Sequence, residues 1–192
     1  MSLNGAGWHY RTLRVRAAAW LLIGLPGRAE QAFTDILARW PLDAHALASR
    51  SHLRAQARRH TEAIADAQAL VAAHPQRCAA DWFNLAFLLE QAQRPDDAMA
   101  AFRRATALDP KLDRAWYGLG LALMKLGRFD EAAAALERNT QLQPMSPYGW
   151  VQLARVQVER REPEQVRRII AHLEGFEPQV AAELERETAL MR

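Results

Sequence analysis

The stretch Ala79–Leu112, AADWFNLAFLLEQAQRPDDAMAAFRRATALDPKL, decides the fold. Its first half places Trp82, Leu85 and Leu89 at i, i+3 and i+7, which puts three large apolar side chains on one side of an α-helix. A second helical pattern follows and ends at Pro110, since proline lacks an N–H donor and biases the residue before it away from the α conformation. The stretch therefore predicts two helices joined by a short turn.

The closing proline recurs along the chain. Pro41, Pro75, Pro110, Pro144 and Pro178 follow one another at steps of 34, 35, 34 and 34 residues. A helix–turn–helix unit of that length, stacked on copies of itself, makes an α-solenoid. We therefore expect an all-α fold built from repeats.

The blocks 79–112, 113–146 and 147–180 carry the same residue types at the same places. The matching sets are Trp82, Trp116 and Trp150; Leu85, Leu119 and Leu153; Ala86, Gly120 and Ala154; Ala98, Ala132 and Val166; and Phe102, Leu136 and Ile170. These sets resemble the pattern of the tetratricopeptide repeat (TPR) family. Two residues depart from it, Asn139 in place of a small residue and Gln157 in place of a large apolar one. The resemblance implies a right-handed superhelical α-solenoid of stacked helix–turn–helix units.

Two degenerate repeats, 8–43 and 44–78, are expected before the three regular ones. The first can be aligned in two ways. Counting back from Pro41 gives one alignment, and matching Gly27 to Gly127 gives another, shifted by three residues. We prefer the proline alignment because it keeps small residues where helices cross.

Residues 179–192 are predicted to form a capping helix, because a narrow, weakly apolar stripe runs among their charged residues. The alternative is the first helix of a further repeat, but no bulky aromatic residue stands at the tryptophan position. The prediction is thus a single TPR domain over residues 1–192, with five repeats and a cap.

Composition and motifs argue against catalysis. The chain has 192 residues, half of them hydrophobic, and a single cysteine, Cys78, so no internal disulfide can form. The sequence contains no glycine-rich phosphate loop, no His-Glu-x-x-His motif and no recognisable nucleophile with a paired base. We expect a non-enzymatic protein with no cofactor and no metal.

The charge pattern does not favour nucleic acid. Arg50, Arg54 and Arg58 step by four along one predicted helix face. However, 25 basic residues stand against 22 acidic ones, which are interspersed throughout, and no aromatic residues alternate with the arginines. We interpret these arginines as solvated side chains paired along helix faces, and expect no nucleic-acid partner.

A basic segment with Arg11, Arg14 and Arg16 precedes the apolar segment Ala17–Leu25, as in some secretion signals. The apolar segment is shorter than the roughly 20 residues that span a bilayer, and no small-x-small cleavage site follows it. We interpret it as a packed first helix, and expect a cytoplasmic protein with no membrane partner.

The resemblance to TPR proteins also implies a binding face, made by first helices at positions that the repeat core does not use. The candidate residues are Phe83, Asn84, Phe87, Arg114, Tyr117, Leu121, Met124, Tyr148, Val151, Gln152 and Arg155. Their large apolar members suit an apolar segment of a partner. The amides can bind its main chain, and the arginines can bind a carboxylate.

Some members of the family hold a chaperone's C-terminal carboxylate in a clamp of Lys, Asn and Arg. Here Asn84 matches the middle Asn and Arg114 can replace a Lys, but Ala48, His52 and Gly118 stand at the other three places. We therefore expect no chaperone-tail clamp.

The predicted function is a non-enzymatic scaffold that binds a peptide or protein segment in the concave groove. An alternative is a regulatory or targeting TPR module, or a fragment of a larger enzyme or of a secretion or assembly system, where it would resemble a secretion chaperone. Weak self-association through exposed helix faces is a third possibility.

Overall fold

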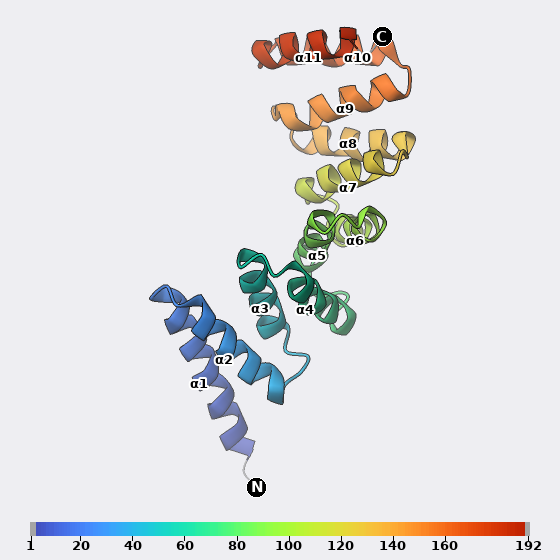
Figure 1. Cartoon of the computed structure of the whole chain (residues 1–192). Helices are drawn as coiled ribbons and strands as arrows, with labels where there is room; N and C mark the ends of the chain where they lie inside the picture. The colour runs from blue at the N-terminus through green and yellow to red at the C-terminus, as the bar shows by residue number, and fades with distance from the viewer. Residues whose placement is uncertain (1–2, 191–192) are drawn as a thin grey trace. The chain divides into compact units, whose positions relative to one another are not determined.

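The computed structural model of the protein describes residues 3–190 and the side chains of residues 7–189. Within this part of the chain there are eleven α-helices and no strand (Figure 1). They are α1 (Leu3–Leu22), α2 (Pro26–Arg39), α3 (Ala44–Gln56), α4 (His60–Ala73), α5 (Ala79–Gln91), α6 (Pro95–Leu108), α7 (Asp113–Lys125), α8 (Phe129–Leu142), α9 (Pro147–Glu159), α10 (Pro163–Glu174) and α11 (Pro178–Leu190). The predicted all-α helical-repeat class is confirmed.

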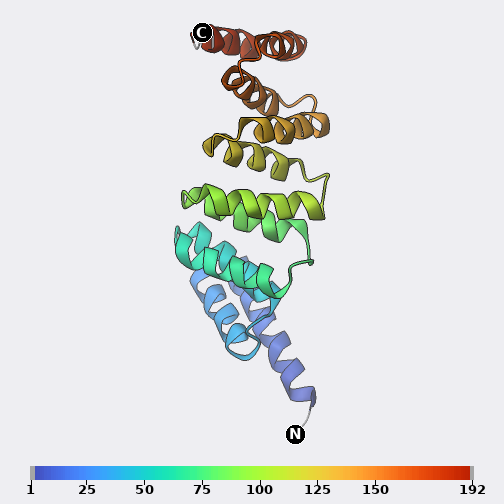
Figure 2. The same ribbon diagram turned by 90° about the vertical axis from the view of Figure 1, so that its right-hand side faces the viewer.

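The chain divides into two compact units, Met1–Ala92 and Gln93–Arg192. In the first unit α1 packs on α2, α2 on α3, α3 on α4 and α4 on α5. In the second unit each helix from α6 to α11 packs on the next (Figure 2). Helix α9 also contacts both α7 and α11. The boundary lies inside the predicted repeat 79–112, and the prediction of one domain over the whole chain stays a prediction.

The turns inside the helix pairs share one backbone conformation. Gly24, Arg58, Gln93, Gly127 and Arg161 have φ values of 74°, 59°, 56°, 68° and 58°, and each lies two residues before the second helix of its pair. A residue in this left-handed region ends a helix, and glycine adopts it without a steric cost.

The same turns fix the alignment of the first repeat. Gly24, not Gly27, has the positive φ that Gly127 has, and Gly27 lies in the first turn of α2. Helix α2 begins at Pro26, fifteen residues before Pro41, just as α8 begins at Phe129, fifteen residues before Pro144. The structure thus follows the alignment counted back from the proline.

The same hydrogen bond recurs in the three regular repeats, between the tryptophan position and the closing proline. The indole N–H groups of Trp82, Trp116 and Trp150 donate to the carbonyl oxygens of the prolines that close the preceding repeats, at 2.9, 3.0 and 2.9 Å. Each tryptophan therefore ties the start of one helix pair to the end of the pair before it.

Small residues allow helices to cross closely, as the sequence predicts. A Cβ at Gly120 would lie 2.6 Å from Cγ of Leu136, closer than two carbons can approach.

The departure at Asn139 is compensated by another glycine. Asn139 is buried and donates to the carbonyl of Asp113 at 3.0 Å, and its Oδ1 lies where a side chain at position 149 would begin, so only Gly149 leaves it room.

Arg50 and Arg54 form a partly buried ionic network in the first unit, at positions where the next repeat has leucines. Asp66 on α4 is 6% exposed and accepts two hydrogen bonds from Arg50, at 2.9 and 2.7 Å, and one from Arg54, at 2.9 Å. Arg54 also donates to Glu30 on α2 at 3.0 Å. The interpretation of these two arginines as solvated is therefore wrong, because each lies within the helix packing and has a carboxylate partner there.

Glu30 forms ion pairs with two arginines. Its carboxylate accepts from Arg54 and also pairs with Arg59. Burial raises the pKa of Glu30, but the hydrogen bonds and charges of Arg59 and Arg54 outweigh burial, so the pKa lies below its usual value.

Helix α11 takes the place that a first helix takes in the repeats. It packs on α10 and α9, as α9 packs on α8 and α7. Ala181, Leu184 and Thr188 are its buried residues. Since its remaining described side chains are largely exposed and charged, it covers the apolar side of the last helix pair with a polar outer surface.

Candidate functional site

In the first unit, α5 carries three of the predicted binding residues. Phe87 and Asn84 are exposed and lie one helical turn apart, while Phe83 is half-buried. An exposed phenylalanine beside an exposed amide is the combination expected for contact with a partner's side chain and main chain.

In the second unit, α7 carries Arg114, which is exposed, and Tyr117, Leu121 and Met124, which are half-buried. Gly118, on the same helix, is buried, and a Cβ there would lie 2.5 Å from Cε1 of the Phe102 ring. In a chaperone-tail clamp this position would face the groove. It instead packs against α6, and a residue with a side chain would not fit there.

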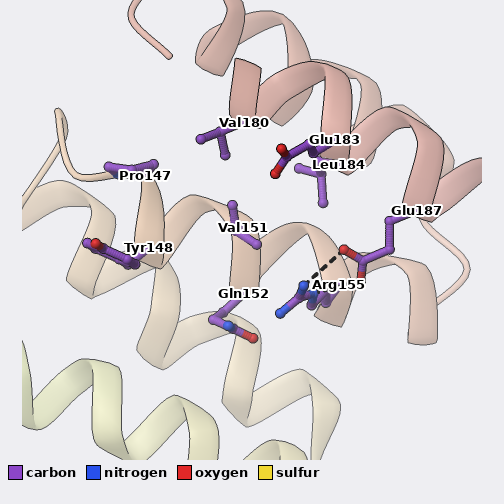
Figure 3. Close-up of a pocket in the computed structure, with 9 residues that line it drawn as sticks. All are labelled: Pro147, Tyr148, Val151, Gln152, Arg155, Val180, Glu183, Leu184 and Glu187. Carbon is purple, nitrogen blue, oxygen red and sulfur yellow. Dashed lines mark hydrogen bonds and ion pairs between the residues drawn. The ribbon is translucent and has the colours of Figure 1, made fainter. Parts of the chain in front are cut away.

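Helix α9 provides the other four predicted residues, and all four line one pocket. Tyr148 is 73% exposed, while Val151, Gln152 and Arg155 are half-buried. The opposite wall comes from Val180, Glu183, Leu184 and Glu187 of α11 (Figure 3). We call this site the α9–α11 pocket.

The α9–α11 pocket is small and mixed in character. It encloses about 280 Å³, slightly less than the roughly 300–1,000 Å³ of sites for cofactors and drug-sized ligands. Val151 and Val180 face each other across it, and Tyr148 lies beside Pro147, at the opposite side from Arg155 and Glu187 (Figure 3). A pocket of this size suits one or two side chains of a polypeptide.

Arg155 already has a partner inside the pocket. Its Nε and Nη2 donate to the two carboxylate oxygens of Glu187 at 2.8 and 2.9 Å, a parallel pair of hydrogen bonds from α9 to α11. The hydrogen bond to Arg155 lowers the pKa of Glu187, and the same bond raises the pKa of Arg155. Arg155 therefore fastens α11 to α9, and the expected free guanidinium for a partner's carboxylate is not present.

The α11 wall was missed by the sequence argument. The sequence pattern predicts only a cover for the last repeat at residues 179–192, and it predicts binding positions only on the first helices of the repeats. The signal was present, since Val180, Glu183, Leu184 and Glu187 recur at helical spacing on one side of α11.

The carboxylate of Glu183 is the uncompensated charge of the pocket. Glu183 is exposed at the rim and forms no ion pair with the described residues, whereas the charges of Arg155 and Glu187 cancel. The site therefore offers two apolar walls, one amide and one free acidic group.

Among the described residues, no group of three or more His, Cys, Asp or Glu side chains is arranged to hold a metal ion. None of the helices described here is both long enough and apolar enough to cross a bilayer.

Two family models describe parts of the chain. Both are tetratricopeptide repeat models, and they match residues 23–77 and 89–150. No curated protein matches the sequence.

Solved structures of repeat proteins share the fold at low sequence identity. MamA superimposes with a TM-score of 0.79 at 18% identity, covering 95% of each chain. YrrB, described as a TPR protein with an unusual peptide-binding site, has a TM-score of 0.79 at 16% identity and covers 88% of each chain. A tetratricopeptide repeat protein from Parabacteroides merdae has a TM-score of 0.80 at 16% identity, covering 96% of this chain and 73% of its own.

Proposed function

Because the chain belongs to the tetratricopeptide repeat family, we propose that it is a non-enzymatic protein-interaction scaffold which binds a peptide segment in the α9–α11 pocket. The adjoining side of α7, with Tyr117 and Leu121, extends this surface, because α7 and α9 are neighbours in the second unit. The side of α5 with Phe87 and Asn84 offers a contact surface of its own in the first unit.

The observation that carries the proposal is the position of Tyr148. A tyrosine that the fold does not bury stands at the mouth of a pocket whose apolar walls are partly open. Exposed aromatic residues next to small pockets are the groups that dominate binding energy at protein interfaces. YrrB, which shares the fold, is itself described as having a peptide-binding site.

The lining indicates the chemistry of the ligand. Val151 and Val180 suit an aliphatic or aromatic side chain, and Gln152 can hydrogen-bond an extended main chain. Glu183 favours a lysine or arginine next to that apolar residue. The proposed ligand is therefore a peptide in which a basic residue stands beside a large apolar one, and not a carboxylate terminus.

The proposal is tested by selecting binders from a displayed library of random short peptides on the full chain. The enriched peptides should carry the basic–apolar pair. Tyr148→Ala should weaken their binding roughly thirtyfold, the loss expected when an aromatic residue that dominates an interface is truncated. Glu183→Gln should weaken the binding of peptides that carry the basic residue more than the binding of peptides in which that residue is replaced by Gln.

Met145→Ala is the matched control. Met145 is an exposed apolar residue in the turn just before α9, and it does not line the pocket. Equal loss of binding in the Met145 and Tyr148 variants, or no loss in the Tyr148 variant, would refute the assignment of the pocket.

A further inference from the structure

The turn that joins α1 to α2 is apolar and exposed. Leu21, Leu22, Ile23 and Leu25 surround Gly24 there, and Leu22 is 88% and Ile23 60% exposed. Runs of exposed large apolar side chains are uncommon on soluble surfaces, and they mark sites of contact with a partner or a membrane.

The repeat does not require apolar residues at this place. In the other four turns the residues equivalent to Leu22 and Leu25 are all polar, although the backbone conformation is the same. These pairs are Gln56 and Arg59, Gln91 and Arg94, Lys125 and Arg128, and Glu159 and Glu162. The apolar side chains of the first turn therefore have a purpose other than forming the turn.

The apolar surface continues along α1. Trp8, Val15 and Leu22 follow at seven-residue intervals, so they lie on one side of the helix over a length of about 21 Å. All three are strongly exposed, whereas Leu13 and Ala17 are buried against the rest of the first unit. Helix α1 thus has a packed apolar side and a second, uncovered one.

The charged residues that α1 and the α1–α2 turn themselves carry have one sign. Arg11, Arg14, Arg16 and Arg28 are exposed, and residues 1–29 contain no Asp or Glu. Arg28 stacks on the ring of Trp20, with its guanidinium carbon 4.7 Å from the ring centroid, which keeps a cation next to the apolar turn.

We propose that the outer side of α1 and the α1–α2 turn bind the surface of an anionic membrane. Apolar side chains of this kind insert into the boundary between headgroups and acyl chains, while neighbouring arginines bind lipid phosphates. A second copy of the chain fits this surface poorly, because it would bring the same four arginines face to face. The proposal revises the expectation of no membrane partner, which considered only spanning and secretion.

The test is co-sedimentation of the full chain with vesicles of phosphatidylglycerol and phosphatidylcholine, and with vesicles of phosphatidylcholine alone. The chain should bind the anionic vesicles, less tightly as salt is raised, and bind the neutral ones weakly. Leu22→Ser with Ile23→Ser should lower the partition coefficient about tenfold or more. Arg11→Gln with Arg16→Gln should lower it about fivefold per arginine.

The matched control replaces Leu42 and Met145 by Ser, since both are exposed apolar residues of turns outside this surface. It should bind vesicles as the unaltered chain does, and circular dichroism should show equal helicity in all variants. The proposal is overturned if anionic vesicles are not bound, or if the Leu22/Ile23 variant binds as well as the control. It is also overturned if light scattering shows a dimer that this variant abolishes, because a second copy would then cover the surface.

Discussion

Removing the carboxylate of Asp66 should destabilise the first unit severely. Asp66→Ala deletes three hydrogen bonds, two from Arg50 and one from Arg54, at 2.7–2.9 Å. Arg50 then keeps only its 3.2 Å hydrogen bond to Thr34, although its side chain is only 15% exposed. Breaking one side of a buried ion pair costs about 3–5 kcal/mol, since the remaining charge is left without a partner.

Three charged residues of the network can be replaced together, because Glu30 keeps Arg59 as its partner. The next repeat shows an apolar version of these three positions, with side chains that need no partner. The counterparts of Arg50, Arg54 and Asp66 there are Leu85, Leu89 and Ala101. The free energy of unfolding of the triple variant Arg50→Leu, Arg54→Leu, Asp66→Ala should therefore equal that of the unaltered chain or exceed it by about 1–4 kcal/mol. Apolar replacements of buried ion pairs often have this effect.

The assay is urea unfolding followed by far-ultraviolet circular dichroism and by the fluorescence of the tryptophans. Asp66→Asn, which keeps the shape and removes the charge, shows how much of the loss is electrostatic. A cost below about 1 kcal/mol for Asp66→Ala would refute the reasoning. So would a triple variant as unstable as the single one.

Three further changes have predicted signs. Gly118→Ala should cost about 1–2 kcal/mol in urea unfolding, because overpacking against the Phe102 ring exceeds the helical gain from alanine, whereas Gly27→Ala, with open space around it, should not destabilise. Glu30, whose pKa is lowered in the folded chain, stabilises it fully above its ordinary pKa and loses that contribution as the pH falls through the folded-state pKa. Glu30→Gln should therefore reduce the loss of unfolding free energy between about pH 5 and pH 3 in an acid titration. Arg161→Gly should stabilise by up to about 1 kcal/mol, because Arg161 has a φ of 58° that glycine adopts without strain, and an unchanged urea midpoint would contradict this.

The repeat pattern was predictable because each of its positions is determined by one local structural requirement. Apolar residues at helical spacing, small residues at crossings and a closing proline identify the helix pairs from Ala79 onwards without reference to distant contacts. The first repeat was ambiguous because glycine is used both at Gly24, where φ is positive, and at Gly27, where it is not. Sequence alone does not distinguish a glycine that the backbone needs from one that it tolerates.

The candidate site was predictable only in part, for physical reasons. A helical position predicts which side a residue faces, and Tyr148 is exposed as that argument expects. A helical position does not predict which residues of other helices pack against that side. The pairing of Arg155 with Glu187 and the packing of the Phe102 ring against Gly118 are therefore seen only in the folded structure. Arg50 was misjudged likewise, because its partner Asp66 lies on the next helix.

The central claim, that the α9–α11 pocket binds a peptide, is tested most directly by mapping a selected peptide onto the isotopically labelled full chain by nuclear magnetic resonance. We expect saturable chemical-shift changes at the amides of residues 148–155 and 180–187, the two helix segments that carry most of the pocket-lining residues. We also expect that Tyr148→Ala removes those changes. Shift changes confined to other helices, with both walls unaffected at saturation, would contradict the claim.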